Sequence, residues 1–175
     1  MEQLQHDDYI NEILTKIDDT RTFPSEFYSK IASVEDQGTA HISVLVGGDA
    51  VSLTSTINTY FGAKFAGRFT GIIFNNQMDD FSTPNKPNYF DLEPSKANYI
   101  RPGKRPMSSM APLIVIDKHT NDPRLVLGAS GGSKILTAVA QVAIKTLWLG
   151  MNIKDAIDDR RIHHQLYPTE VQLEN

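Results

Sequence analysis

The sequence of 175 residues predicts an α+β layered domain, because it contains two β-hairpin patterns that are flanked by helical patterns. In the first hairpin pattern, segments 41–46 and 50–55 alternate in character on either side of a Gly-Gly-Asp turn. The second pattern consists of 113–116 and 124–127, which a turn-like stretch separates. A hydrophobic content of 40% is normal for one globular domain with a sizeable core.

Helical spacing of apolar residues occurs before and after these hairpins. A short amphipathic helix is predicted over 10–17, a longer helix over 135–149 that ends at Gly150, and a shorter one over 153–161. The segment 75–105 is polar and rich in Pro, and it is predicted to be a long surface loop. In the longer helix the apolar positions at helical spacing are Leu136, Val139, Ala140, Ala143 and Leu147.

Composition and charge exclude several classes of protein. The formal net charge is −4 and the charges are mixed, so we expect no nucleic-acid partner. The chain has no cysteine, which excludes disulfides, thiol nucleophiles and thiolate metal sites. We expect neither a metal nor a cofactor, and we interpret the pair His163-His164 as a solvated helix end because no further ligand cluster accompanies it.

A Gly-rich elbow follows the second hairpin at 128–133. An elbow of this kind can hold phosphate at the N-terminus of the helix that follows it. The phosphate loop requires Gly, Lys and Ser or Thr in that order, whereas Ser133 precedes Lys134 here. We therefore do not expect this elbow to bind a nucleotide.

Five sequence blocks carry a resemblance to a known family. They are Gly38-Thr39-Ala40-His41, residues 54–58 with Tyr60-Phe61-Gly62, residues 74–81, residues 101–106 with Ser108-Ser109-Met110, and residues 128–132. With these blocks in this order, the sequence from Asp36 onward resembles the γ-glutamyltransferase (glutathione hydrolase) family of the Ntn-hydrolase superfamily. The resemblance implies a layered α-β-β-α sandwich, of which this chain would be the light-chain half and would be incomplete.

The resemblance further implies that Thr39 is a nucleophile that cleavage of the Gly38-Thr39 bond activates. An N-terminal Thr carries its own base, since an α-amine has a reference pKa of about 7.7–8.0. Residues 1–38 would then be a pre-cleavage segment that resembles the end of a large subunit, and 39–175 the catalytic small-subunit domain, truncated at its C-terminus. The implied substrates are glutathione and other γ-glutamyl compounds, with water, amino acids or dipeptides as acceptors.

The resemblance also assigns roles to other residues, which taken singly would be explained as strand or turn residues. A second hydroxyl would bond the nucleophile, a polar cluster would hold the α-amino and α-carboxylate groups of the substrate, and a pair of serines would donate to that carboxylate. Two glycines would form an oxyanion hole, where the absence of Cβ lets backbone N–H groups approach. The second hydroxyl is that of Thr56, and the polar cluster consists of Asn58, Gln77 and Asp80. The serines are Ser108 and Ser109, and the glycines are Gly131 and Gly132.

Two alternatives stay open at this point. The chain could be an uncleaved, catalytically inactive light-chain paralogue or fragment that acts as a binding partner, or it could be another amidohydrolase with an N-terminal Thr. The resemblance implies a large-subunit partner. It also implies a location at the cell surface, outside the cell or in the periplasm, although this chain contains no secretory leader and no apolar run of the ~18 residues that span a bilayer.

Overall fold

The computed structural model describes residues 6–21, 23–24, 27, 38–86, 94–166 and 169–174. It consists of two compact units, Met1–Ile31 and Ala32–Asn175. In the first unit, helix α1 (Asp7–Lys16) confirms the predicted amphipathic helix, with two Asp in its first turn and Lys16 in its last, as the helix dipole favours. Across the described ranges, no helix combines the length and the apolar character that crossing a membrane requires.

The first hairpin of the second unit confirms the predicted pattern and extends it to Thr39. Strands β1 (Thr39–Val46) and β2 (Asp49–Thr56) pair antiparallel, with Val46 opposite Asp49 and Thr39 opposite Thr56. Gly47 and Gly48 form the turn with φ of 59° and 93°, and this two-residue turn needs positive φ at both positions. The register therefore places Thr39 at the open end of the hairpin, beside Thr56.

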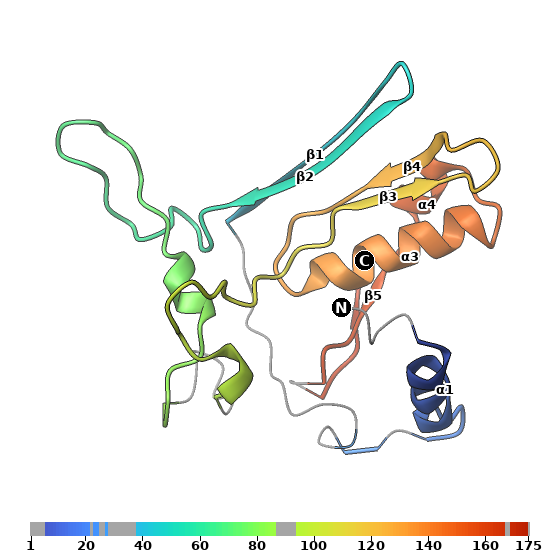
Figure 1. Ribbon diagram of the computed structural model, residues 1–175, viewed down its shortest axis with the longest axis horizontal. Coiled ribbons are helices and arrows are strands. Elements are labelled where there is room, and N and C mark those ends of the chain that lie inside the picture. The colour runs from blue at the N-terminus through green and yellow to red at the C-terminus, as the bar shows by residue number, and fades with distance from the viewer. Residues whose placement is uncertain are drawn as a thin grey trace. The chain divides into compact units, whose positions relative to one another are not determined.

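The second hairpin lies between the first hairpin and a helix (Figure 1). Strands β3 (Leu113–Ile116) and β4 (Pro123–Leu127) form it, as predicted. The Ser52 hydroxyl of β2 donates to the Leu127 carbonyl at 2.8 Å and accepts from the Leu113 N–H at 3.1 Å, which joins the two hairpins. Three layers result, and they confirm the α+β class as part of a layered sandwich.

The core lies between the second hairpin and helix α3 (Lys134–Leu147), with helix α4 (Ile153–Asp158) at its edge. The structure confirms three of the five predicted apolar positions of α3: Val139 and Ala143 are buried and Leu147 packs against the core, whereas Leu136, 54% exposed, and Ala140 are exposed. Ile135 and Val142 are buried beside the confirmed positions, so the core-facing stripe begins at Ile135, directly after the elbow. The buried core residues are Leu125, Leu127, Ile135, Val139, Val142, Ala143 and Ala156.

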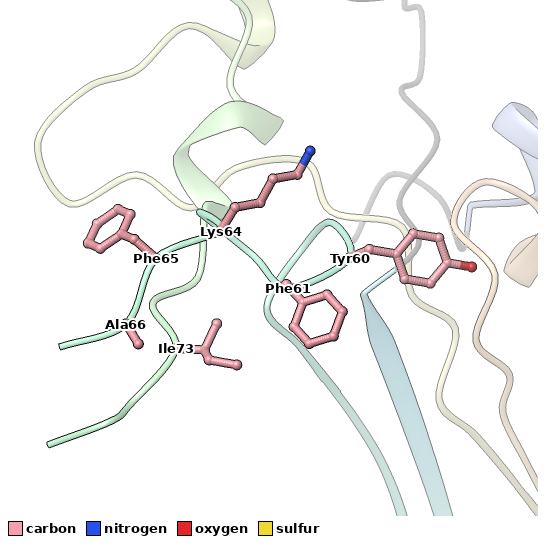
Figure 2. A pocket seen from close by; sticks show the side chains of 6 residues that line it. All are labelled: Tyr60, Phe61, Lys64, Phe65, Ala66 and Ile73. Atoms are coloured by element: carbon pink, nitrogen blue, oxygen red, sulfur yellow. The ribbon is translucent and has the colours of Figure 1, made fainter. Parts of the chain in front are cut away.

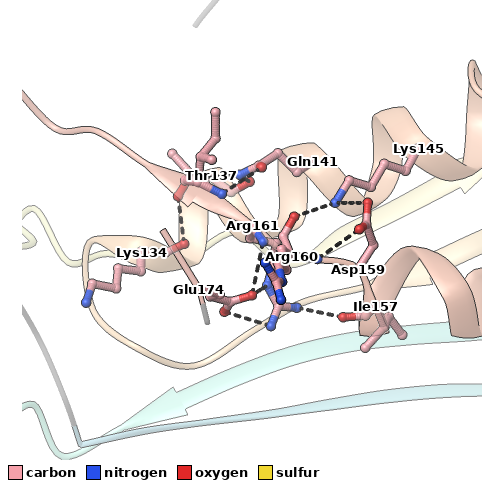
Figure 3. A network of polar contacts seen from close by, with 10 residues as sticks. Lys134, Thr137, Gln141, Lys145, Ile157, Asp159, Arg160, Arg161 and Glu174 are labelled. Carbon is pink, nitrogen blue, oxygen red and sulfur yellow. Dashed lines mark hydrogen bonds and ion pairs between the residues drawn. The ribbon is translucent and has the colours of Figure 1, made fainter. Parts of the chain in front are cut away.

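A short sheet, β5 (Ile162–His163) with β6 (Gln172–Leu173), lies against α3. The Gln141 amide donates to the Ile162 carbonyl at 2.6 Å and accepts from the Ile162 N–H at 3.0 Å, so a helix side chain replaces a neighbouring strand (Figure 3). The ion pair Arg161–Glu174, 2.9 Å long, holds β6 to β5. His163 is 7% exposed in this sheet, so its interpretation as a solvated helix end is wrong: α4 ends at Asp158, and the chain then turns back toward α3.

The segment 75–105 is mostly irregular in its described part, as expected of a long loop. It contains two short 3-10 helices, η2 (Gln77–Asp80) and η3 (Lys96–Asn98). Its residues 87–93 lie outside the described residues. The Asn98 amide donates to the Asp80 carbonyl at 2.6 Å, which joins the two short helices.

Candidate functional site

Thr39 and Thr56 lie in a series of hydrogen bonds that ends on the peptide bond before Thr39. The Thr39 hydroxyl donates to the Thr56 oxygen at 3.1 Å, and the Thr56 hydroxyl donates to the Gly38 carbonyl at 3.0 Å. The same carbonyl accepts from the Ile57 N–H at 3.1 Å. Two donors therefore polarise the Gly38 carbonyl while the neighbouring hydroxyl is held beside it.

Asn58 holds this series in place through its backbone. Its N–H donates to the Thr56 oxygen at 2.9 Å, and its carbonyl accepts from the Gly38 N–H. Asn58 is 3% exposed and has φ of 76°, a left-handed conformation that Asn adopts more readily than most residues. Its side chain donates to the Asn76 carbonyl at 3.1 Å, which connects this part of the site to η2.

The backbone of Asn58 and Thr59 lies very close to Gly38. A Cβ at this position would collide with the carbonyl groups of Asn58 and Thr59. Because these atoms belong to the main chain, they cannot turn away as the end of a flexible side chain would. A glycine before Thr39 therefore lets the strand that contains the peptide bond lie tightly against residues 57–59.

Gln77, Asp80 and Ser108 are brought together in a second cluster. Asp80 is 8% exposed, and its Oδ2 accepts from the Ser108 hydroxyl at 2.5 Å and from the Gln77 amide. The Gln77 amide also donates to the Ser108 oxygen, at 2.6 Å. Ser109 is half-buried beside Ser108, and within the described residues its side chain makes no hydrogen bond. A carboxylate surrounded by short polar groups is suited to binding an ammonium group.

Gly131 and Gly132 have φ of 127° and 63°, values that side-chain-bearing residues rarely adopt. Their carbonyls accept from the N–H groups of Lys134 and Ile135 at 3.3 and 3.1 Å, as the first turn of α3 forms. Their own N–H groups donate to nothing in the described ranges. The elbow therefore presents two amides that a negatively charged oxygen could use.

The elbow meets β1 at His41, a residue to which the sequence analysis assigned no role. Gly128 lies so close to the His41 ring that a Cβ would overlap it. His41 contacts the hydroxyls of Thr54 at 2.9 Å and Ser43 at 3.0 Å. Because alternate residues of a strand share a face, Thr39 and His41 point to the same side of the hairpin, and at His41 this side meets the elbow. The spacing of two residues between Thr39 and His41 on a predicted strand could have indicated that His41 lies on the same face as Thr39.

A surface pocket of 440 Å³ lies in the loop that follows β2 (Figure 2). Its lining is mostly apolar, and Figure 2 shows the side chains of Tyr60 and Lys64 extending in different directions. The pocket contains none of the residues of the two clusters described above, so we do not assign the candidate chemistry to it. The lining residues are Tyr60, Phe61, Lys64, Phe65, Ala66 and Ile73.

Comparisons with known proteins show the family to which the chain belongs. The sequence profile of the Gamma-glutamyltranspeptidase family matches residues 1–175. Scoloptoxin SSD14 of Scolopendra dehaani is 45% identical over 99% of this chain and 30% of its own length, and Glutathione hydrolase 3 of Arabidopsis thaliana is 42% identical over 100% and 28%. The chain thus spans less than a third of the length of these relatives.

One shorter relative and one solved structure add to the comparison. The Arabidopsis thaliana protein named Putative inactive glutathione hydrolase 4 is 43% identical over 91% of this chain and 85% of its own length. The structure is an acivicin-inhibited gamma-glutamyltranspeptidase whose C-terminus is described as critical in autoprocessing and catalysis. It matches with a TM-score of 0.69 and 42% identity, over 76% of this chain and 71% of that one. The chain belongs to the gamma-glutamyltranspeptidase family.

Proposed function

We propose that this chain is the catalytic half of a γ-glutamyl hydrolase or transferase that acts on glutathione and related γ-glutamyl compounds, and that it activates itself by cleavage between Gly38 and Thr39. The observation that carries the proposal is the series of hydrogen bonds from the Thr39 hydroxyl through Thr56 to the Gly38 carbonyl. A nucleophile held next to its target by other groups reacts in an effectively unimolecular step.

In the proposed cleavage, Thr39 Oγ1 bonds to the Gly38 carbonyl carbon. The Thr39 hydroxyl proton passes to Thr56 while the Thr56 proton passes to the carbonyl oxygen, where the Ile57 N–H also donates. The carbon–nitrogen bond then breaks, the nitrogen takes up the proton, and Gly38 becomes esterified to the Thr39 oxygen. Water hydrolyses this ester, which leaves a carboxylate on Gly38 and a free α-amine on Thr39.

The free α-amine is the proposed general base of turnover. It removes the proton from the Thr39 hydroxyl as the oxygen bonds to the γ-carbonyl carbon of the substrate. The leaving amine takes the proton and departs, which leaves a γ-glutamyl ester on Thr39. Water or the amine of an acceptor amino acid or dipeptide then attacks the ester, giving glutamate or a new γ-glutamyl compound.

The two polar clusters supply the proposed contacts to the substrate. The Asp80 carboxylate pairs with the α-ammonium, and Asn58 and Gln77 belong with it to the cluster that holds the α-amino and α-carboxylate groups. Ser108 and Ser109 donate to the α-carboxylate. This assignment is supported by the burial of Asp80 and by the hydrogen bonds that hold it beside Gln77 and Ser108. The N–H groups of Gly131 and Gly132 donate to the oxyanion of the tetrahedral intermediate, a contribution that typically amounts to about 10²–10³ in rate for each donor.

A large-subunit partner completes the proposed enzyme. The support is that the chain spans 28% to 30% of the length of the full-length relatives. In this proposal residues 1–38 are the pre-cleavage segment, and 39–175 belong to the catalytic small-subunit domain. A location at the cell surface, outside the cell or in the periplasm remains a prediction from the family resemblance.

A second candidate function is an uncleaved, inactive binding partner. The observation that favours it is the relative named Putative inactive glutathione hydrolase 4, of which the matched region covers 85%. This candidate needs no chemistry from Thr39. The two candidates therefore differ in whether the peptide bond after Gly38 is cut.

Intact-mass measurement of the purified chain tests the first candidate, with loss of residues 1–38 as the expected result. Thr39→Ala should prevent both cleavage and the release of product from a γ-glutamyl anilide, whereas Thr39→Ser keeps a hydroxyl and should still be cut. Thr59→Ala is a matched control, because the Thr59 hydroxyl bonds to Gly62 and Asn76 instead of the Gly38 carbonyl.

Two results would contradict the proposal. A chain that stays uncut and releases no product when a large subunit is supplied would favour the inactive binding partner. Cleavage that persists in Thr39→Ala would show that another group is the nucleophile.

A further inference from the structure

His163 lies in a buried polar network that reaches the glycine elbow. Its Nε2 is 2.8 Å from Gln165 Oε1, and the same oxygen accepts from the Ser133 hydroxyl at 2.5 Å. His163 and Ser133 are 7% and 4% exposed. Ser133 is the last residue of the elbow and directly follows Gly132. The imidazole is therefore connected to the elbow through Gln165, which contacts both His163 and Ser133.

Two side chains of helix α3, Thr137 and Gln141, hold this network in place. His163 Nδ1 is 2.8 Å from the Thr137 hydroxyl, one turn along the helix from Ser133. Gln141, one further turn along, bonds both the N–H and the carbonyl of Ile162 (Figure 3). The residue before His163 is thus tied to the helix, and the imidazole cannot shift without breaking these bonds.

Both ring nitrogens of His163 lie within hydrogen-bond distance of a polar partner, Gln165 Oε1 for Nε2 and the Thr137 hydroxyl for Nδ1. The Thr137 hydroxyl also donates to the Lys134 carbonyl at 3.1 Å, within the first turn of α3. The contacts of the buried ring therefore continue on both sides toward the start of this helix.

Ser133 is the residue before the first turn of α3, a position where a serine side chain usually accepts from the backbone N–H groups of that turn. Here its side chain makes no such bond and instead donates to Gln165. The network therefore keeps the Ser133 oxygen away from the end of the helix.

We propose that His163, Gln165 and Ser133 form a positioning network that holds the glycine elbow in the conformation in which the N–H groups of Gly131 and Gly132 stabilise the oxyanion. The inference rests on the proposed function for its consequence in catalysis. His163 is a positioning residue, since it acts through Gln165 and Ser133 and contacts no reacting atom. Its loss should lower kcat much more than it raises KM, because in the proposed function the Asp80 cluster holds the α-amino and α-carboxylate groups of the substrate.

Hydrogen exchange of the full chain tests the network without requiring activity. His163→Ala should accelerate exchange of the Lys134 and Ile135 amides, which close the elbow by donating to the Gly131 and Gly132 carbonyls, by about tenfold, the ratio that corresponds to the loss of one hydrogen bond. His164→Ala is the matched control: His164 is exposed and adjacent, and its Nδ1 accepts from the Leu166 N–H at 3.4 Å. His163→Gln keeps an N–H donor and should restore slow exchange at the elbow.

Turnover of a γ-glutamyl anilide, measured with a large subunit supplied, tests the consequence. We expect kcat of His163→Ala to fall about 10- to 100-fold with KM within about threefold, and His163→Gln to recover most of kcat. Ser133→Ala removes only a hydroxyl and should give the same pattern, which keeps the test usable if His163→Ala fails to fold.

The outcomes separate the inference from the proposed function. Elbow exchange that is unchanged in both His163→Ala and Ser133→Ala, or accelerated equally in His164→Ala, would overturn the network. An unchanged kcat in a folded, active Ser133→Ala protein would overturn its role in catalysis. A wild-type protein without turnover would contradict the proposed function, while elbow-specific acceleration in His163→Ala would still support the network.

Discussion

The hydroxyl of Thr56 provides the sharpest test of the cleavage chemistry. It accepts from the Thr39 hydroxyl at 3.1 Å and from the Asn58 N–H at 2.9 Å, and it donates to the Gly38 carbonyl at 3.0 Å. Thr56→Val replaces this hydroxyl with a methyl group of similar volume. Valine is also β-branched, so the preference for a strand conformation is retained. The substitution therefore isolates the hydroxyl from the shape of the side chain.

The expected magnitude follows from what remains after the substitution. The Gly38 carbonyl keeps the Ile57 N–H at 3.1 Å and loses the Thr56 hydroxyl. Loss of one donor to a developing oxyanion lowers a rate by about 10²–10³, so cleavage of Thr56→Val should slow by that factor. The Asn58 N–H also loses an acceptor, which should lower the free energy of unfolding by about 1–3 kcal/mol.

The assay follows the intact mass of the chain over time after purification, with thermal unfolding measured on the same samples. Thr56→Ser keeps the hydroxyl and should cleave within about tenfold of the wild-type rate, because it retains the donor that the mechanism requires. If Thr56→Val cleaves as fast as the wild-type chain while remaining folded, the proton path through Thr56 is refuted. Equal slowing of Thr56→Ser and Thr56→Val would likewise show that the hydroxyl is not the important group.

Three further predictions concern packing, charge and substrate binding. Gly128→Ala places a methyl group in the His41 ring and should destabilise the fold by about 1–3 kcal/mol in urea unfolding; His41→Ala combined with it should recover part of this loss. Hydrogen bonds and charge from Arg161 lower the pKa of Glu174. The pairing of the two residues therefore stabilises the fold above the ordinary pKa of a glutamate, and this contribution disappears as the pH falls through the lowered pKa. Because Glu174 is largely exposed, Arg161→Gln should lower the free energy of unfolding by roughly 0.2–1 kcal/mol near pH 7 and by less in acid. Asp80→Asn should raise KM for a γ-glutamyl anilide about 10- to 100-fold with a smaller effect on kcat, since it removes the charge proposed to pair with the ammonium.

The parts of the fold with local causes could be predicted from sequence. Alternation of apolar residues and a Gly-Gly turn are enough to define the first hairpin, and Gly150, with φ of 71°, follows the end of α3 as expected. The proposed site residues are distant in sequence, and a resemblance was needed to associate them. The structure brings Gln77, Asp80 and Ser108 together through side-chain bonds that no spacing rule predicts.

The parts that could not be predicted depend on tertiary contacts. The burial of His163 results from the return of the chain to α3 and from partners on Thr137 and Gln165, none of which the motif His163-His164 indicates. At the start of α3 the prediction chose Leu136 over Ile135 and was wrong: both residues are equally apolar, and only the exit direction of the elbow decides which one enters the core. The sequence also gives no sign that the Ser133 side chain would turn away from its own helix.

The length of the first hairpin has a consequence for how this chain can vary. Pairing runs without interruption from Val46 opposite Asp49 to Thr39 opposite Thr56, so the distance from the turn determines which residue stands at the open end. One added residue in the turn would shift the pairing by one position and rotate the Thr39 side chain to the opposite face of the strand. A surface turn would ordinarily tolerate such an insertion. Here we expect a turn of constant length in any homologue that cuts itself, even though Gly47 and Gly48 lie at the far end of the hairpin from the bond proposed to be cleaved.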